Sequence, residues 1–479
     1  MLVAQLACMN VVDPDLYHEM GLIRAARQIG SLPHRDLFAY TPTINPSVHH
    51  EWGTGLVTYA VTVALGGAGL TALKWLVMAG LVALCVHAAR QRGTSWPVLC
   101  ALAPIAIQLG IVGISTFRAQ IFTLLFTALL LTWLDRDRLG SRRWVPAWLI
   151  VYVLWLNLHA GFVVGIGLVG AYWLEQVLLK KGVQWRLPAI LAVILGLVLL
   201  NPYGTDYPRY LWRGLFMPRP MIVEWTPLWR DMNLFVTFLI ALLVAGYAIW
   251  KNGWRNSPGF LIVMACALAA VRYSRHANLL AVAFACYVPG WIQQTALAGK
   301  LEGFWQWRHK TVVALSVAVG AFCLVLAIAK TPWQLYVPAS PHPQRFKNLV
   351  YPVGAVEYLR QQRFSGNVMT PFNSGSFVSW NLFPAVKVAL DGRYEVAYQP
   401  GLLEEISDFY DAKDNWRGTL NKYPTDLVLA RVDCPLALRM GETNWKCVYR
   451  DDAFVLFARP GIELMSVNRV GQTLVGTFP

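Results

Sequence analysis

Residues 97–115 read PVLCALAPIAIQLGIVGIS, a run of 19 residues without one charged side chain. A helix rises about 1.5 Å per residue, so this run is long enough to cross a hydrocarbon core of about 30 Å. The whole chain shares this character, because 56% of its 479 residues are hydrophobic and only 14% are charged. A soluble domain has about 25% charged residues. The run therefore predicts a transmembrane helix in an integral membrane protein.

Similar apolar runs recur between residues 72 and 329, separated by short loops and by one long loop at 201–233. Ten segments are long enough, or nearly so, to cross the membrane: 72–89, 97–115, 119–134, 145–158, 160–179, 188–200, 234–250, 258–271, 279–297 and 311–329. After residue 330 the composition becomes that of an ordinary globular domain. We therefore predict a transmembrane domain over 1–330 and a soluble domain over 331–479.

The net charge of +15 comes from basic residues that lie mainly in loops between the apolar runs. They form no basic patch interleaved with aromatic residues, which argues against nucleic acid as a partner. Five alternate loops carry them: Arg90 and Arg92; Arg136, Arg138, Arg142 and Arg143; Lys180, Lys181 and Arg186; Lys251 and Arg255; Lys300, Arg308 and Lys310. Because basic loops stay cytoplasmic, the other loops and the soluble domain are expected to be extracytoplasmic.

Residues 12–71 then form the first outward loop. This topology requires residues 54–71 to lie along the outer membrane surface as an amphipathic helix, since a further span there would reverse every later loop. The apolar start, Met1 to Met9, is too short to cross the membrane. It represents either a truncated first span or a span that continues, with an uneven apolar pattern, through Val12.

The first outward loop is the outward stretch that is richest in ionisable groups: Asp13, Asp15, His18, Glu19, His34, Asp36, His49, His50 and Glu51. Carboxylates held where the bilayer meets water are partly desolvated, which raises their pKa toward the range of a general base. Asp13 and Asp15 fit this description. The alternative is that Asp15 caps the helix that follows, and each of the two aspartates can serve one role.

His49, His50 and Glu51 offer two imidazoles and a carboxylate to a metal ion, but adjacent side chains of an extended segment point to opposite faces. The alternative is that Trp52 anchors this segment at the membrane interface while one histidine bonds a neighbouring loop. Whether the protein binds a divalent metal stays open at this point.

Several motifs resemble, in their order along the chain, those of the GT-C superfamily of membrane glycosyltransferases, particularly bacterial proteins similar to protein mannosyltransferases and to the aminoarabinose transferase of lipid A. The matching segments are Asp13-Pro14-Asp15, Pro33-His34-Arg35-Asp36-Leu37-Phe38, His50-Glu51-Trp52, Phe117-Arg118-Ala119-Gln120, Trp155-Leu156-Asn157-Leu158-His159, Asn201-Pro202-Tyr203-Gly204 and Glu224-Trp225. Ala119 departs from the proline that is usual there.

The resemblance implies a polytopic α-helical protein of about 10–11 spans in the bacterial inner membrane. It implies transfer of a sugar from a polyprenyl-phosphate donor to a glycan, lipid or protein acceptor on the outer face, with inversion. The base toward the acceptor hydroxyl corresponds to Asp13 or Asp15. Two other classes compete: a catalytically silent subunit of a membrane complex, and a transporter, which the few charges within the spans disfavour.

A departing lipid phosphate needs a nearby cation, and a guanidinium group gives a planar, bidentate fit. Arg118, Arg272 and Arg275 are the outward candidates, the alternative for each being contact with lipid headgroups. Asn157 and His159 lie at the end of a span, where polar side chains either serve a site or satisfy the backbone of a broken helix. Glu224 is a further candidate.

The soluble domain shows an α/β pattern, with helices predicted at 355–362 and 374–382, strands at 366–371, 386–391 and 425–431, and a hairpin at 445–460. Asp391-Gly392-Arg393 follows one strand, where α/β domains often bind ligands. A structural turn with a paired Asp391 and Arg393 explains the motif equally well. Cys434 and Cys447 are the cysteines of this domain, and their pairing would require an oxidising compartment.

Overall fold

A computed structural model describes residues 10–479, except 180, 218, 220–221, 331–333 and 341–348. The chain divides into two compact units. The helical unit consists mainly of Thr71–Gly204 and Phe216–Trp333, and the mixed unit consists of Val11–Leu70, Thr205–Leu215 and Gln334–Pro479. The first outward loop, which the sequence pattern grouped with the transmembrane domain, thus folds together with the C-terminal residues.

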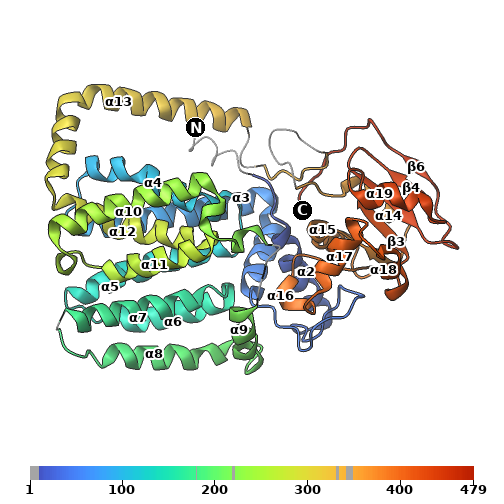
Figure 1. Ribbon diagram of the computed structural model, residues 1–479, viewed down its shortest axis with the longest axis horizontal. Helices are drawn as coiled ribbons and strands as arrows, with labels where there is room; N and C mark the ends of the chain where they lie inside the picture. Colours follow the sequence, from blue (N-terminus) through green and yellow to red (C-terminus); the bar gives the residue numbers. More distant parts are fainter. Residues whose placement is uncertain (1–9, 180, 218, 220–221, 331–333, 341–348) are drawn as a thin grey trace. The chain divides into compact units, whose positions relative to one another are not determined.

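The helical unit has a helix at each of the ten predicted spans: α3 (Trp52–Gln91, whose first part belongs to the mixed unit), α4 (Trp96–Ser115), α5 (Gln120–Arg138), α6 (Trp144–Leu158), α7 (Phe162–Leu178), α8 (Arg186–Leu197), α10 (Met232–Asn252), α11 (Phe260–Arg272), α12 (Ala277–Gln293) and α13 (Ala296–Lys330). Figure 1 shows α4 to α8 and α10 to α12 side by side with nearly parallel axes. Among the described residues, α3, α4, α10 and α13 are long and apolar enough to cross a membrane. The chain is thus a polytopic helical membrane protein.

The 40-residue helix α3 breaks at Gly66, where φ is 63° and ψ is −158°. Such a positive φ strains residues that carry a Cβ, so glycine suits the break. The break separates a helix over 52–65 from one over 67–91, whereas the sequence placed this boundary between residues 71 and 72. The orientation of the first part along a membrane surface stays a prediction, and the prediction for Met1 to Met9 falls outside the described residues.

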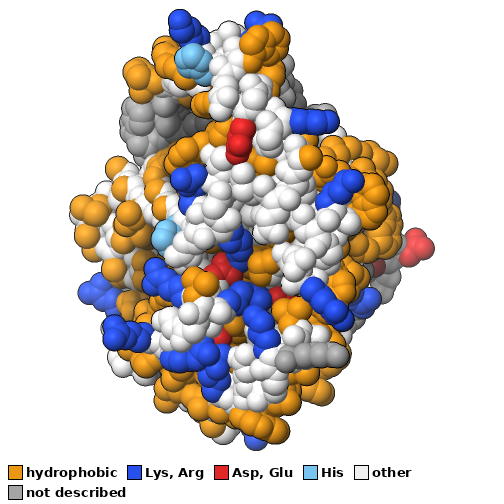
Figure 2. All heavy atoms as spheres, turned by 90° about the vertical axis from the view of Figure 1, so that its left-hand side faces the viewer, with side chains coloured by type: hydrophobic (Ala, Val, Ile, Leu, Met, Phe, Trp, Pro, Cys, Tyr) orange, Lys and Arg blue, Asp and Glu red, His pale blue; other side chains and the backbone are white. Residues whose placement is uncertain are grey.

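The alternate loops of the helical unit gather at its two ends. At one end Arg92 ion-pairs with Asp135 and donates to a main-chain carbonyl of α12, and Arg186 Nη2 lies 2.7 Å from Asp137 Oδ2. Figure 2 looks onto this end and shows many Lys and Arg side chains. At the other end the Gly113 amide donates to Asn278 (3.0 Å). The loops therefore sort into the two sets that the charge pattern predicts.

The mixed unit contains a six-stranded sheet with the order β2-β1-β3-β5-β4-β6. Its strands are β1 (Gly366–Met369), β2 (Val386–Val388), β3 (Leu427–Arg431), β4 (Lys446–Arg450), β5 (Phe454–Ala458) and β6 (Val467–Asn468). β1 pairs in parallel with β2 and β3, whereas β5 is antiparallel to β3 and β4. The helices are α14 (Val353–Gln361), α15 (Phe372–Leu382), α16 (Tyr394–Ala397), α17 (Leu402–Tyr410), α18 (Trp416–Lys422) and α19 (Pro435–Arg439). The predicted α/β pattern, hairpin included, is confirmed.

The N-terminal segment completes the mixed unit. Helix α2 (Pro14–Ile29) packs on α15, with the rings of Tyr17 and Phe377 5.2 Å apart and the Arg24 guanidinium 4.3 Å from the Trp380 ring. The chain at residues 38–40 lies along the edge of β2, where the Val388 amide donates to the Phe38 carbonyl (2.9 Å). These contacts place the acidic N-terminal segment against the turn that follows β2.

One sequence interpretation that concerns this unit needs correction. The stretch 201–233, interpreted as a loop, contains helix α9 (Asp206–Phe216). Pro208 lies in the first turn of this helix, where no amide hydrogen is needed. Cys434 and Cys447, whose pairing the sequence left open, are both free.

Candidate functional site

The acidic motif starts helix α2. Asp13 is the N-cap, and its Oδ1 accepts from the Asp15 amide at 3.1 Å. The sequence interpretation gave the cap to Asp15, but the helix begins earlier because Pro14, with its fixed φ, suits the first helical position. Asp15 thus lies in the first turn of α2, where the positive end of the helix dipole favours a carboxylate.

The Asp391-Gly392-Arg393 turn lies against this first turn. A methyl group on Gly392 would lie 3.2 Å from Asp15 Oδ1 and 3.5 Å from His18 Nδ1. Ser376 Oγ accepts from the Gly392 amide at 3.3 Å and lies 3.5 Å from His18 Nδ1. A catalytic candidate of the N-terminal loop and a candidate motif of the C-terminal domain therefore meet in one place.

Arg393 connects two buried carboxylates. Its Nε and Nη2 donate to Asp391 at 2.9 and 2.7 Å, and its Nη1 ion-pairs with Asp36. Burial would raise the pKa of Asp391, but the charge and hydrogen bonds of Arg393 hold it below its usual value. The pairing of Asp391 with Arg393 that was expected of a structural turn is therefore present. Asp36, another candidate site residue, belongs to the same group of ion pairs.

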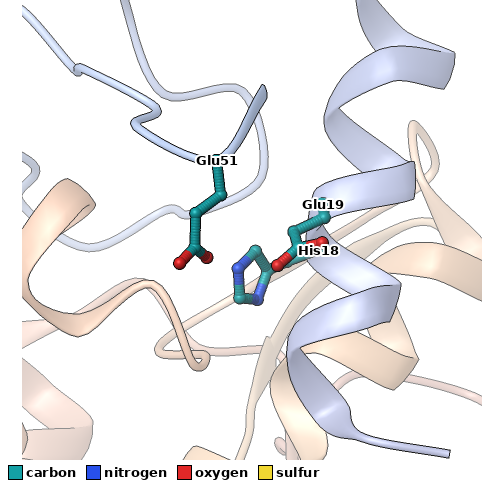
Figure 3. Close-up of side chains that lie close together, drawn as sticks. All are labelled: His18, Glu19 and Glu51. Carbon is teal, nitrogen blue, oxygen red and sulfur yellow. The ribbon is translucent and has the colours of Figure 1, made fainter. Parts of the chain in front are cut away.

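A second cluster lies one turn further along α2. Figure 3 shows His18, Glu19 and Glu51 pointing toward one another, with one possible ligand atom of each lying within 4.8 Å of the others. Glu19 is only 3% exposed. Burial, and then the charge of Glu51, raises the pKa of Glu19 well above its usual value. Burial lowers the pKa of His18, although Asp15 and Asp391 oppose this.

The two adjacent histidines take different places. His50 Nδ1 lies 2.9 Å from the Tyr210 hydroxyl of α9, so the bond predicted for one histidine to a neighbouring segment is present. Its other nitrogen, Nε2, lies 3.3 Å from Glu51 Oε1. His49 lies 3.4 Å from Ser47 Oγ, and burial lowers its pKa well below the usual value. His18 of α2 and His50 of the loop therefore both lie near Glu51.

In the helical unit, two arginines lie against one aromatic ring, and a third pairs with the residue that precedes that ring in the chain. The guanidinium groups of Arg219 and Arg275 lie 4.1 and 4.7 Å from the centre of the Trp225 ring. Arg118 ion-pairs with Glu224. Burial would raise the pKa of Glu224, but Arg118 and Arg275 lower it below the usual value. Arg219 was not among the sequence candidates, although it lies six residues before Trp225 in a basic and aromatic stretch.

The remaining candidates make local contacts. Arg272 lies 5.2 Å from the ring of the neighbouring tyrosine. Asn157 Nδ2 donates to the main-chain carbonyl one turn earlier at 2.9 Å, and its Oδ1 accepts from Asn201 at 3.2 Å. His159 Nδ1 accepts from the Gly161 amide at 2.9 Å. Asn157 and His159 thus satisfy backbone groups where α6 ends, which is one of the two roles expected for them.

No protein-family model matches the sequence, and no curated protein matches it either. Solved structures do match the fold. This likeness supports the GT-C-like fold that the sequence predicts. One of them is ArnT from Cupriavidus metallidurans, in a crystal structure bound to undecaprenyl phosphate. The match has a TM-score of 0.53 and 12% sequence identity, and it covers 95% of this chain and 96% of that chain. At this identity the likeness concerns the fold.

Proposed function

We propose that this chain is a membrane glycosyltransferase that moves a sugar from a polyprenyl-phosphate donor to an acceptor on the outer face of the bacterial inner membrane. The observation that carries the proposal is the likeness of fold, over 95% of the chain, to a transferase crystallised with undecaprenyl phosphate. In this proposal the mixed unit is extracytoplasmic, and the acceptor is a glycan, a lipid or a protein.

Asp15 is the proposed general base. The acceptor hydroxyl attacks C1 of the sugar, and its proton passes to the Asp15 carboxylate. The bond between C1 and the phosphate oxygen breaks as the new bond forms, so the configuration at C1 inverts. We prefer Asp15 to Asp13 for this role, because Asp15 lies beside the Asp391-Gly392-Arg393 turn, whereas Asp13 is the N-cap of α2.

The arginine cluster around Trp225 is the proposed site for the phosphate that departs with its lipid. Arg219 and Arg275 lie against Trp225, and Arg118 pairs with the adjacent Glu224, so three guanidinium groups lie around these two neighbouring residues. Guanidinium groups bind phosphate oxygens in a bidentate geometry and stabilise the charge that develops there.

Asp15→Asn in the full-length, detergent-purified protein tests the assignment of the base. The variant is expected to insert and to retain polyprenyl phosphate in native mass spectrometry, but to lose transfer. Asp411→Asn, an exposed position of the mixed unit, is the matched control and is expected to behave as the wild type. Full activity of both Asp13→Asn and Asp15→Asn would show that the base lies elsewhere.

A catalytically silent subunit of a membrane complex is the second candidate. Two observations favour it, since Arg118 is already paired with Glu224 and Ala119 departs from the proline expected beside it. Purification from the native membrane distinguishes the two functions. A stoichiometric protein partner without bound polyprenyl phosphate would support the silent subunit, whereas bound lipid without such a partner would support the transferase.

A further inference from the structure

One buried aspartate joins two short loops at the basic end of the helical unit. Asp137, near the end of α5, accepts from Arg142 at 2.9 Å and from Arg186 at 2.7 Å. The indole of Trp144 and the hydroxyl of Tyr172 donate to the same carboxylate, at 2.9 and 2.7 Å. The loop between α5 and α6 is therefore held beside the loop between α7 and α8.

These two loops carry more positive charge than the one aspartate neutralises. Residues 139–143 and 179–186 contain no Asp or Glu. Figure 2 shows this end of the helical unit, where most of the charged side chains are Lys or Arg. Among the described residues of the two loops, four basic side chains are exposed or half-exposed: Arg142, Arg143, Lys181 and Arg186. The loops therefore form a cationic patch.

Two helices begin at this patch and add to its positive potential. Helix α6 starts at Trp144 and α8 starts at Arg186, and the two helices are in contact. In neither helix does the N-cap side chain accept a hydrogen bond from the first turn. Because the positive end of a helix dipole favours an anion, both helix starts reinforce the basic side chains.

Apolar side chains are exposed among the charges. Leu139 is 84% exposed and Trp185 is 75% exposed, although both lie in the basic loops. Further along the two helices, Ile150 of α6 and Val193 of α8 are exposed as well. A small soluble anion would gain nothing from such side chains, whereas a phospholipid offers both a phosphate and acyl chains. The combination therefore fits a lipid.

We propose that residues 139–143 and 179–186 bind the headgroup phosphate of an anionic phospholipid whose acyl chains lie against α6 and α8. Guanidinium groups donate charge-assisted hydrogen bonds to phosphate oxygens, and an exposed indole suits the level of the headgroups. The charge pattern assigns this end to the cytoplasmic leaflet. A topology signal alone would make all the basic loops equivalent, whereas a binding site singles out these two. The inference does not depend on the proposed transferase activity.

A titration of the full-length, detergent-purified protein in native mass spectrometry tests the site. The probes are phosphatidylglycerol and phosphatidylcholine with identical acyl chains. Each basic residue near an anionic lipid contributes about fivefold in affinity, so the wild type should prefer phosphatidylglycerol by about tenfold or more. The double variant Arg143→Gln/Lys181→Gln leaves the ion pairs of Asp137 in place, and it should lose about tenfold or more of that affinity.

The matched control removes two charges elsewhere at the same end. Lys251→Gln/Arg255→Gln replaces two exposed basic residues of the segment between α10 and α11, and it should bind phosphatidylglycerol nearly as the wild type does. Equal losses in the two double variants would overturn the proposal, because general surface charge would then explain the binding. Equal affinity of the wild type for the two lipids would overturn it as well.

A second pair of variants separates a lipid from a free anion. Trp185→Ala should weaken the binding of phosphatidylglycerol, whereas Trp250→Ala should not, although the two indoles are 75% and 74% exposed. Inorganic phosphate at the same concentration should not displace the lipid. If phosphate does displace it and Trp185→Ala binds as the wild type does, the patch recognises an anion alone and the assignment to a phospholipid is wrong.

Discussion

Arg393 forms an ion pair with Asp36, 357 positions earlier in the chain, and only 1% of either side chain is exposed. The other oxygen of Asp36 accepts from the amides of Phe38 (2.9 Å) and Ala39 (2.7 Å), at the start of the segment that lies along β2. Arg393 thus fastens the N-terminal loop to the turn that follows β2. Since Asp15 and His18 contact the same turn, the ion pair also helps to place them.

Arg393→Met tests how much this ion pair contributes to stability. The substitution leaves Asp36 and Asp391 buried without their cation, and breaking a buried pair typically costs about 3–5 kcal/mol. We expect a loss of that size in the free energy of unfolding, followed by tryptophan fluorescence in detergent. Arg417→Met is the control, because Arg417 is 52% exposed and pairs with Glu442 at the surface. It should change stability by less than about 0.5 kcal/mol, and equal losses in the two variants would contradict the role of Arg393.

Gly392→Ala tests the approach of this turn to Asp15. The added methyl group would lie 3.2 Å from Asp15 Oδ1, so the carboxylate or the turn must shift by a few tenths of an ångström. Small displacements of catalytic groups slow the reaction. We therefore expect the rate of transfer to fall about tenfold in a protein that still folds. Gly21→Ala on α2, the helix that carries Asp15, is the control, since its methyl group would meet only ordinary contacts at 3.9 Å. Unchanged activity of Gly392→Ala would argue against Asp15 as the base.

The fold could be predicted well where burial alone determines the structure. The helices of the spans follow from apolar runs such as 97–115, because a helix is one of the few structures that satisfy the backbone hydrogen bonds of a chain inside a membrane. The hairpin of β4 and β5 follows from alternating apolar residues between turn signals. Helix α9 was missed, because nothing in the sequence of 201–233 shows that Pro208, one of its five prolines, lies in a first turn, where it does not interrupt a helix.

The site was predicted only in part, because it depends on contacts between residues far apart in the sequence. Asp15 and Arg393 were candidates on separate grounds, yet nothing in the sequence indicates that the turn at Gly392 contacts α2. His18 and Glu19 were noted only as ionisable residues. Their spacing to Glu51 has no sequence signature, since the pairing of α2 with the end of the first loop is set by tertiary packing.

Asp391 makes the stability of the mixed unit depend on pH. Its pKa in the folded protein is lowered by Arg393 and, to a smaller extent, by His18, with Asp36 and the Tyr398 hydroxyl as further neighbours of the arginine. A lowered folded pKa gives stability that is fully present above the unfolded value of about 4 and is lost as the pH falls through the folded value. The unfolding midpoint should therefore be steady near neutral pH and fall below about pH 4. In Asp391→Asn the fall should be shallower, and identical slopes in the two proteins would exclude this carboxylate as a source.

Arg275 provides the test of the lipid-phosphate site. Its guanidinium lies against Trp225 beside Glu224, and a charge-assisted hydrogen bond to phosphate contributes about 1.5–3 kcal/mol. Arg275→Gln should therefore lower the affinity for undecaprenyl phosphate by roughly tenfold or more, measured by native mass spectrometry of the purified protein. Arg308→Gln is the control, because Arg308 stacks on the exposed Trp307 of α13 at 3.8 Å and its loss should leave lipid binding unchanged. If both variants bind the lipid equally well, the arginines around Trp225 have a structural role and the donor phosphate is bound elsewhere.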